Sequence, residues 1–249
     1  MKKTLAIVSL LGISLAAPIL AQAADGADYE SKGQITFIPN TDPTNPVSPT
    51  DPDPDKPIRP VDPTDPENPD AINPGTQGPL SIDFASTLYF GEQKISSRTE
   101  VYHAESQKYV DADGESQEGP NFVQVTDNRG TESGWTLKVR QDGQFKTDAG
   151  QVLEAAEIRF TNGEIVTPSD SPEPTVLKEE ITLDPEGAES LVMSAQAGEG
   201  AGTYLTRWGK DMEEAVKSIE LEVPGSTTKY ATQYTTTFTW LLTDTPTNP

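Results

Sequence analysis

Two Trp-x-Leu pairs have the residue types and spacing of a binding surface. Trp135 with Leu137, and Trp240 with Leu242, would each place a ring and an aliphatic side chain on one face of a strand. A tryptophan with apolar neighbours on the same face most often belongs to a protein core, which favours a structural role. The alternative is direct contact, in which an exposed ring stacks on a sugar or lies against a partner strand.

A second aromatic pair, Tyr204 and Trp208, follows the glycine-rich run 198–202. Trp208 is a candidate ring for stacking on a sugar or contacting a partner, with Tyr204 beside it; burial in the core is the alternative. The run looks like a flexible loop or a bulge. It contains neither the G-x-G-x-x-G pattern nor a P-loop lysine, so we do not expect it to bind a nucleotide.

An acidic stretch from Asp111 to Glu118 resembles a calcium loop in the spacing of its carboxylates. An EF-hand loop needs glycine at its sixth position and glutamate at its twelfth. Here Gly114 is fourth and Phe122 stands at the twelfth position. The stretch therefore favours a solvated acidic turn, although the sequence leaves open whether it holds an ion.

The chain has few residues that could act as a nucleophile, as its base, or as a metal ligand. The chain has no cysteine and a single histidine, His103, which a Ser-His-Asp triad would have to use. Disulfides, cysteine nucleophiles and multi-histidine metal sites are thereby excluded. Carboxylates are abundant, but no motif selects a glycosidase pair. We therefore predict that the protein is not an enzyme, with no catalytic, cofactor-binding or metal residues and no cofactor.

The charge balance limits the partners. Forty Asp and Glu residues oppose 18 Lys and Arg, a formal net charge of −22. Nucleic-acid binding depends on basic residues that neutralise phosphates, so nucleic acid is not an expected partner. Attraction to anionic lipid or teichoic acid is disfavoured for the same reason.

The N-terminus predicts export. Residues 1–23 combine Lys2 and Lys3 with an apolar run and an Ala21-Gln22-Ala23 cleavage site, the pattern of a signal peptide. Cleavage would remove both lysines and no acid, taking the formal net charge from −22 to −24. The apolar run is shorter than the about 20 residues of a membrane span. We expect a secreted chain with no transmembrane segment in its mature form.

A proline- and aspartate-rich stretch interrupts the mature chain. Residues 39–79 repeat proline with the period of polyproline II, about three residues per turn, and predict a disordered insertion. Ile35 and Phe37 alternate in residues 33–38, which predicts a strand that must pair with the body because a lone strand is unstable. The predicted organisation is an N-terminal strand region at 24–38, the insertion at 39–79 and a body at 80–249.

The body predicts an all-β, antiparallel β-sandwich of about ten short strands. Alternation is clearest in 134–140, and the longest alternating run is 230–243. Asn162-Gly163 has the signature of a type I′ hairpin turn. Met212 to Ile219 has helical spacing, which indicates a short helix or turn. Further strands are predicted at 82–84, 87–90, 99–102, 122–125, 158–160, 165–166, 177–183 and 219–223.

The chain resembles the WxL domain of Gram-positive surface proteins. The resemblance rests on the segments 134–139 and 234–243, each with Trp-x-Leu, together with 78–84, 123–130, 155–158 and 223–227. The N-terminal strand and the proline-rich insertion look similar as well, so the resemblance spans essentially the whole mature chain. It implies a cell-surface protein attached non-covalently to the cell wall, with peptidoglycan as ligand.

The resemblance also implies partners. These are other WxL proteins and a membrane-anchored protein with a WxL-interacting domain. The leading hypothesis is therefore a wall-binding module. The alternative is an interaction subunit that docks on the anchored partner and engages host or plant ligands, and a carbohydrate-active enzyme is the third hypothesis. The oligomeric state and the external ligand stay open.

Overall fold

The computed structural model describes residues 28–65, 67–68 and 71–247. The signal peptide predicted for residues 1–23 lies outside them. The chain divides into two units, residues 1–37 and residues 38–249.

In the first unit, residues 28–37 run as an extended segment with no strand. Ile35 is 76% exposed and Phe37 is 85% exposed. The prediction of a strand at 33–38 is therefore wrong. Alternating apolar residues show only which face could be buried, and a stable strand also needs a neighbour that pairs with its backbone.

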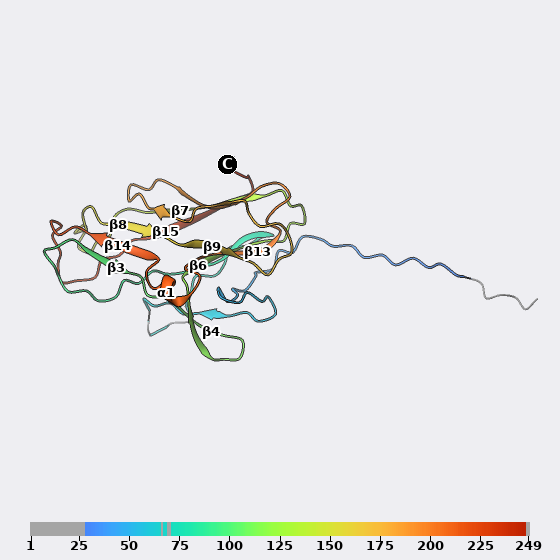
Figure 1. Ribbon diagram of the computed structural model, residues 1–249, viewed down its shortest axis with the longest axis horizontal. Coiled ribbons are helices and arrows are strands. Elements are labelled where there is room, and N and C mark those ends of the chain that lie inside the picture. Colours follow the sequence, from blue (N-terminus) through green and yellow to red (C-terminus); the bar gives the residue numbers. More distant parts are fainter. Residues whose placement is uncertain (1–27, 66, 69–70, 248–249) are drawn as a thin grey trace, which may run out of the picture. The chain divides into compact units, whose positions relative to one another are not determined.

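The second unit is built of short strands, with fifteen strands and one helix among its described residues (Figure 1). The predicted all-β class is confirmed, but the strands form four small antiparallel sheets instead of the two large layers of the predicted sandwich. Four small sheets make the arrangement propeller-like, although each sheet joins strands that lie far apart in the sequence. The strand orders are β1 (Arg59–Pro60), β4 (Gln107–Val110), β5 (Ser116–Gly119); β10 (Val176–Leu177), β12 (Ser190–Ala195), β7 (Trp135–Gln141), β15 (Phe238–Thr243); β11 (Ile181–Thr182), β8 (Glu157–Phe160), β14 (Ile219–Val223), β3 (Glu100–His103); and β2 (Leu80–Ala85), β6 (Phe122–Asp127), β13 (Gly202–Trp208), β9 (Gly163–Val166).

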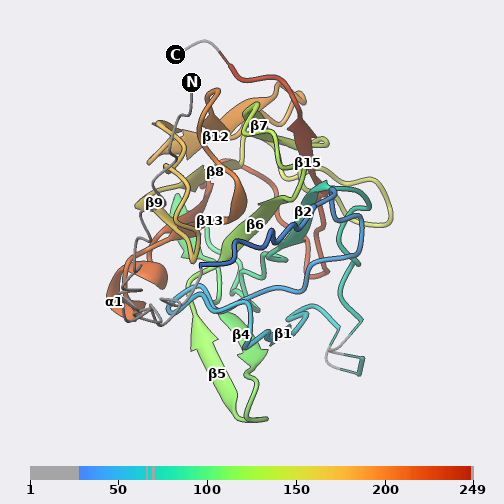
Figure 2. The same ribbon diagram turned by 90° about the vertical axis from the view of Figure 1, so that its right-hand side faces the viewer.

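The β2-β6-β13-β9 sheet, called here the central sheet, is covered on both faces. In Figure 2 it crosses the middle of the unit, with β7, β12 and β15 above it and β1, β4 and β5 below. Every residue of β6 is buried. Successive side chains of a strand point to opposite faces, so Val123 and Val125 enter the main core while Phe122 enters a second, smaller core.

The proline-rich segment supplies part of that second core. Val47 is 2% exposed and Ile58 is 4% exposed, and both pack with Phe122. The segment also contributes strand β1, which pairs with β4. The described part of residues 39–79 is therefore ordered against the central sheet, and the prediction of a disordered insertion is wrong.

The physical reason lies in the hydrogen bonds that the backbone of the segment makes. Some stay within the segment, as from the Ile58 N–H to the Pro46 carbonyl at 2.9 Å, and others join it to the central sheet. The Val47 N–H donates to Gln124 Oε1 at 2.8 Å, and Arg207 Nη1 donates to the Pro49 carbonyl at 3.0 Å. A few apolar residues between the prolines, such as Val47 and Ile58, are buried in the second core. The average composition of the segment does not reveal them.

The predicted hairpin at Asn162-Gly163 is a corner between sheets. Strands β8 and β9 flank it, but β8 pairs with β14 and β11 while β9 pairs with β13. Asn162 has a φ of 56° and Gly163 has no positive φ, whereas a type I′ turn needs both. Gly163 instead allows the backbone at Lys178 to approach closely, because a Cβ at position 163 would lie 2.9 Å from the Lys178 carbonyl oxygen.

Other local predictions have mixed outcomes. Strand β7 and the short helix α1 (Met212–Ala215) form where they were expected, with the Asp211 side chain accepting from the Glu214 N–H at 3.0 Å as an N-cap. The run 230–243 is a strand only from Phe238, and 177–183 breaks into β10 and β11. No strand forms at 87–90.

Candidate functional site

The two Trp-x-Leu pairs lie on adjacent strands, β7 and β15. In this antiparallel pair Trp240 stands opposite Val139, and Leu242 stands opposite Leu137. Strand β7 has a second neighbour, β12, so it is internal to its sheet, whereas β15 is the edge strand. Two segments about a hundred residues apart therefore form one apolar surface. One of its two strands is flanked on both sides, and the other lies at the edge of the sheet.

Trp135 is a core residue. Its side chain is fully buried, and its Nε1–H donates to the Gly200 carbonyl at 2.9 Å. Gly200 has a φ of +77°, and a Cβ there would lie 2.7 Å from Trp135 Nε1. The glycine-rich run that the sequence presents as a flexible loop or bulge therefore closes over this ring, and the first motif has the structural role that its pattern favours.

Trp240 is only half-buried. One side of its ring packs on Trp208, with ring centroids 6.0 Å apart and an angle of 45° between the ring planes. Trp240 also lines an open cavity. It is the only one of the three tryptophans that is not buried. The sequence gives no sign of this difference, because both motifs have the same local pattern.

Tyr204 and Trp208 are not surface rings. Tyr204 is 0% exposed and Trp208 is 1% exposed, so burial in the core, one of the two alternatives, applies, and neither ring is the proposed contact for a sugar or a partner. The Tyr204 hydroxyl donates to the Ser171 carbonyl at 2.7 Å, and Phe160 packs on Trp208 with ring centroids 4.8 Å apart. Both residues lie on β13 and point into the main core.

The cavity beside Trp240 has a volume of about 170 Å³. It lies where the edge strands β2 and β15 meet β4 and the end of the proline-rich segment. Its walls combine apolar side chains with amides, hydroxyls and carboxylates. The lining residues are Val61, Asp62, Ile72, Asn73, Pro74, Gly75, Thr76, Ile82, Asp83, Phe84, Ala85, Thr87, Gln107 and Trp240.

Asp83 is the most deeply buried acid of the cavity wall. Its Oδ1 accepts from Ser81 Oγ at 2.6 Å, and its Oδ2 accepts from Thr126 Oγ1 at 2.6 Å and from Gln124 Nε2 at 2.8 Å. Burial raises the pKa of Asp83, and these hydrogen bonds oppose the rise. Gln124 also bonds the Val47 backbone, so the network ties the proline-rich segment to the central sheet.

The acidic stretch from Asp111 to Glu118 comprises the turn between β4 and β5, residues 111–115, and most of β5. Asp111 Oδ1 accepts from the backbone N–H groups of Asp113, at 3.1 Å, and of Glu115, at 2.9 Å. Hydrogen bonding, first from the Glu115 N–H, lowers the pKa of Asp111. The carboxylate thus stabilises the turn. Within the described ranges, no group of three or more His, Asp or Glu is placed to hold a metal ion.

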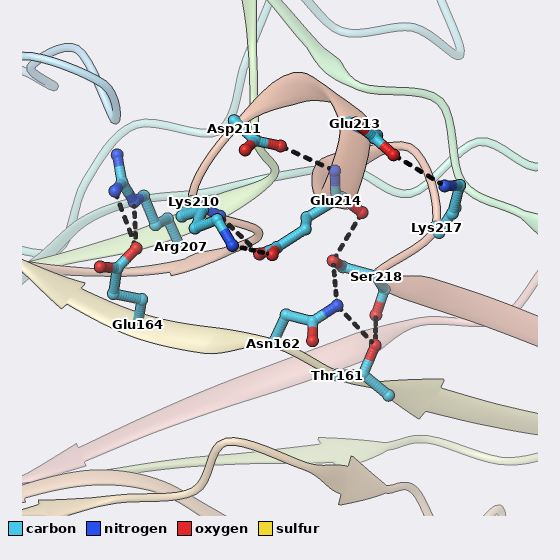
Figure 3. Close-up of polar contacts among 10 residues, drawn as sticks. All are labelled: Thr161, Asn162, Glu164, Arg207, Lys210, Asp211, Glu213, Glu214, Lys217 and Ser218. Carbon is cyan, nitrogen blue, oxygen red and sulfur yellow. Dashed lines mark hydrogen bonds and ion pairs between the residues drawn. The ribbon is translucent and has the colours of Figure 1, made fainter.

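Several ionisable groups near the surface are engaged in pairs. Figure 3 shows Arg207 on Glu164, with Nη2 to Oε2 at 2.7 Å, and Lys210 on Glu214, a contact that raises the pKa of the lysine. His103 Nε2 lies 3.5 Å from Glu220 Oε1. These contacts fix α1 and the neighbouring strands, and their geometry brings no nucleophile to a base.

An all-β fold with one accessible tryptophan ring beside a polar cavity has the features of a binding domain. The chain belongs to the WxL family: residues 24–246 match the family described as "WxL domain surface cell wall-binding". The resemblance seen in the sequence is thereby confirmed, and the family is one of binding domains, not of enzymes. No curated protein and no solved structure matches the chain.

The family places the protein at the cell-wall surface. The one helix in the part of the chain that the structure describes is too short to cross a membrane.

Proposed function

We propose that the mature protein is secreted, attaches non-covalently to the wall of a Gram-positive cell and binds peptidoglycan through its WxL domain. The observation that supports this most strongly is the extent of the family match, residues 24–246, which includes the proline-rich segment and both Trp-x-Leu strands. The wall-binding unit is then the whole folded domain and not a short appended motif.

The charge of the chain indicates which wall component is bound. A formal net charge of −22 opposes attraction to the phosphates of teichoic acid. Binding must then come from polar and apolar contacts with a component of low charge density, and the glycan of peptidoglycan provides these. No step of this proposal requires a catalytic residue.

Sedimentation with purified sacculi tests the proposal. The mature chain, residues 24–249, should pellet with Gram-positive sacculi in the absence of any partner. Stripping teichoic acid from the sacculi should leave retention unchanged or raise it, and added salt should not release the protein. An acidic control protein of similar net charge should stay in solution. If retention is lost after stripping, the peptidoglycan assignment is wrong.

An interaction subunit, held by a membrane-anchored WxL-interacting protein or by other WxL proteins and engaging host or plant ligands, is the second candidate. The exposed apolar residues Tyr29, Ile35 and Phe37 of the N-terminal segment favour it, because such side chains commonly serve contacts between proteins. The same sedimentation separates the two candidates. A chain that pellets only when the anchored partner is present supports the second.

A further inference from the structure

We propose that the cavity beside Trp240 binds a single neutral sugar ring of a glycan. This inference rests on the proposed wall binding and names the site and the chemistry that would carry it. The cavity is formed within the second unit by the edge strands β2 and β15, by Gln107 of β4 and by the end of the proline-rich segment.

The aromatic wall is pre-organised. Trp240 packs on Trp208, at 6.0 Å between ring centroids, and Trp208 packs on Phe160 at 4.8 Å. A ring fixed in this way loses little conformational freedom when a ligand packs on it. The C–H face of a pyranose is the flat, weakly polar surface that such an indole accommodates.

The polar wall offers unused hydrogen-bonding groups. Gln107 is 3% exposed, and its Nε2 donates to the Val61 carbonyl at 2.9 Å and the Lys108 carbonyl at 2.8 Å. Its Oε1 accepts no hydrogen bond from the described residues, and it is not one of their fully enclosed polar atoms. At the rim, Asn73 and Thr87 are exposed, with side chains that have no described hydrogen-bond partner. Hydroxyl groups of a sugar can satisfy all three.

The charges of the wall select against anions. The ionisable side chains that line the cavity are two acids, Asp62 and Asp83, and no lysine or arginine is among them. Both oxygens of Asp83 are already engaged by Ser81, Gln124 and Thr126. A phosphate or carboxylate would meet like charge with no compensating cation. A neutral, hydroxyl-rich ligand meets no such penalty.

The volume limits how much of a glycan is enclosed. Pockets for drug-sized ligands occupy roughly 300–1,000 Å³, and this cavity has about 170 Å³. One ring would therefore enter while the rest of the chain passes outside, as binding to a long polymer requires.

Two glycan sources share this chemistry, and two arms of a titration distinguish them. The mature protein is titrated with oligomers of β-1,4-linked N-acetylglucosamine, which represent the wall glycan, and with xylo- and cello-oligosaccharides, which represent plant polymers. The readout is the indole N–H signals of the three tryptophans in an ¹⁵N-correlated NMR spectrum. Trp240→Phe assigns the signal of interest by its disappearance. We expect saturable chemical-shift changes that are largest for the Trp240 signal. We expect the N-acetylglucosamine oligomers to bind more tightly than the xylo- and cello-oligosaccharides.

Rim variants test the site without disturbing the core. The double variant Asn73→Ala/Thr87→Ala should weaken oligosaccharide binding by about tenfold or more, because two hydrogen bonds are lost. The matched control Thr232→Ala/Gln233→Ala removes a similar hydroxyl and amide from exposed positions away from the cavity and should bind as the wild type does. If the two double variants bind alike, or if no oligosaccharide shifts Trp240, the cavity is not a sugar site.

The failures of the two proposals are distinguishable. If the wild type pellets with sacculi but no oligosaccharide binds the cavity, the wall-binding function stands and the sugar site falls. If oligosaccharides bind the cavity and the rim variants weaken them while sacculi are not bound, the sugar site stands and the peptidoglycan assignment falls.

Discussion

Leu137 and Leu242 stand directly opposite each other in the antiparallel pair of β7 and β15. The second residues of the two Trp-x-Leu motifs therefore meet, and the two tryptophans lie on the same face, on either side of this leucine pair. Opposed apolar side chains on paired strands stabilise a sheet. The family signature thus marks one continuous apolar stripe, closed over at Trp135 and open at Trp240.

Truncating the buried ring tests the role of the first motif. Trp135→Ala should lower the free energy of unfolding by about 3–5 kcal/mol, through lost burial and an unfilled cavity. Urea denaturation measures the change, and Tyr230→Ala, at a ring that is 47% exposed, is the control, expected within about 0.5 kcal/mol of wild type. Sacculus binding should fall only by the unfolded fraction. A stable Trp135→Ala protein that no longer binds would make the ring a contact residue.

The glycine-rich run offers a matched pair of substitutions. Gly200 and Gly198 both have positive φ, +77° and +89°, so alanine strains the backbone at either position. Only at Gly200 would the new Cβ also meet Trp135 Nε1, at 2.7 Å. Gly200→Ala should therefore lower the free energy of unfolding by about 1–3 kcal/mol more than Gly198→Ala. Equal losses in urea denaturation would show that the run does not pack on the ring.

The proline-rich segment should contribute to stability. Ile58→Ala should lower the free energy of unfolding by about 2–5 kcal/mol, because Ile58 is 4% exposed and lies in the second core. Ile35→Ala is the control, since Ile35 is 76% exposed. Thermal and urea unfolding of the two variants provide the comparison. If Ile58→Ala is as stable as Ile35→Ala, the segment is a spacer after all.

Burial of Asp83 predicts a dependence of stability on pH. Its pKa is raised in the folded state, so the folded protein binds this proton more readily than the unfolded chain does. The stability that this group contributes is fully present below the unfolded pKa of about 3.9 and is lost as the pH rises through the folded pKa. Urea denaturation gives the unfolding free energy of wild type and of Asp83→Asn at each pH. The value for wild type minus the value for the variant should fall as the pH rises from the unfolded pKa through the folded pKa, and should stay constant at higher pH.

The exposed Asp148→Asn variant, measured over the same pH series, is the control for replacing an acid by an amide. A constant difference between wild type and Asp83→Asn would contradict the raised pKa of Asp83.

The alternation of apolar and polar residues was sufficient to predict strands that have one apolar face and one more polar face. In β7, the residues Trp135, Leu137 and Val139 alternate with more polar ones, and the strand forms as predicted. Strands β4, β5 and β12 were missed, and so was β13, where Tyr204 and Trp208 were read as surface candidates. β6 has both faces buried because a second layer covers the central sheet, and the source of that layer, a proline-rich segment, has a composition typical of disorder.

The sequence by itself determined the all-β class, the acidic charge and the family, since each depends on composition or on residues close together in the chain. Only the tertiary structure decided which tryptophan is available to a ligand. Trp135 and Trp240 have the same local pattern, but β7 lies between two strands beneath the glycine-rich run, while β15 is a sheet edge beside the cavity. Exposure depends on what packs against a residue, and those neighbours come from segments far away in the sequence.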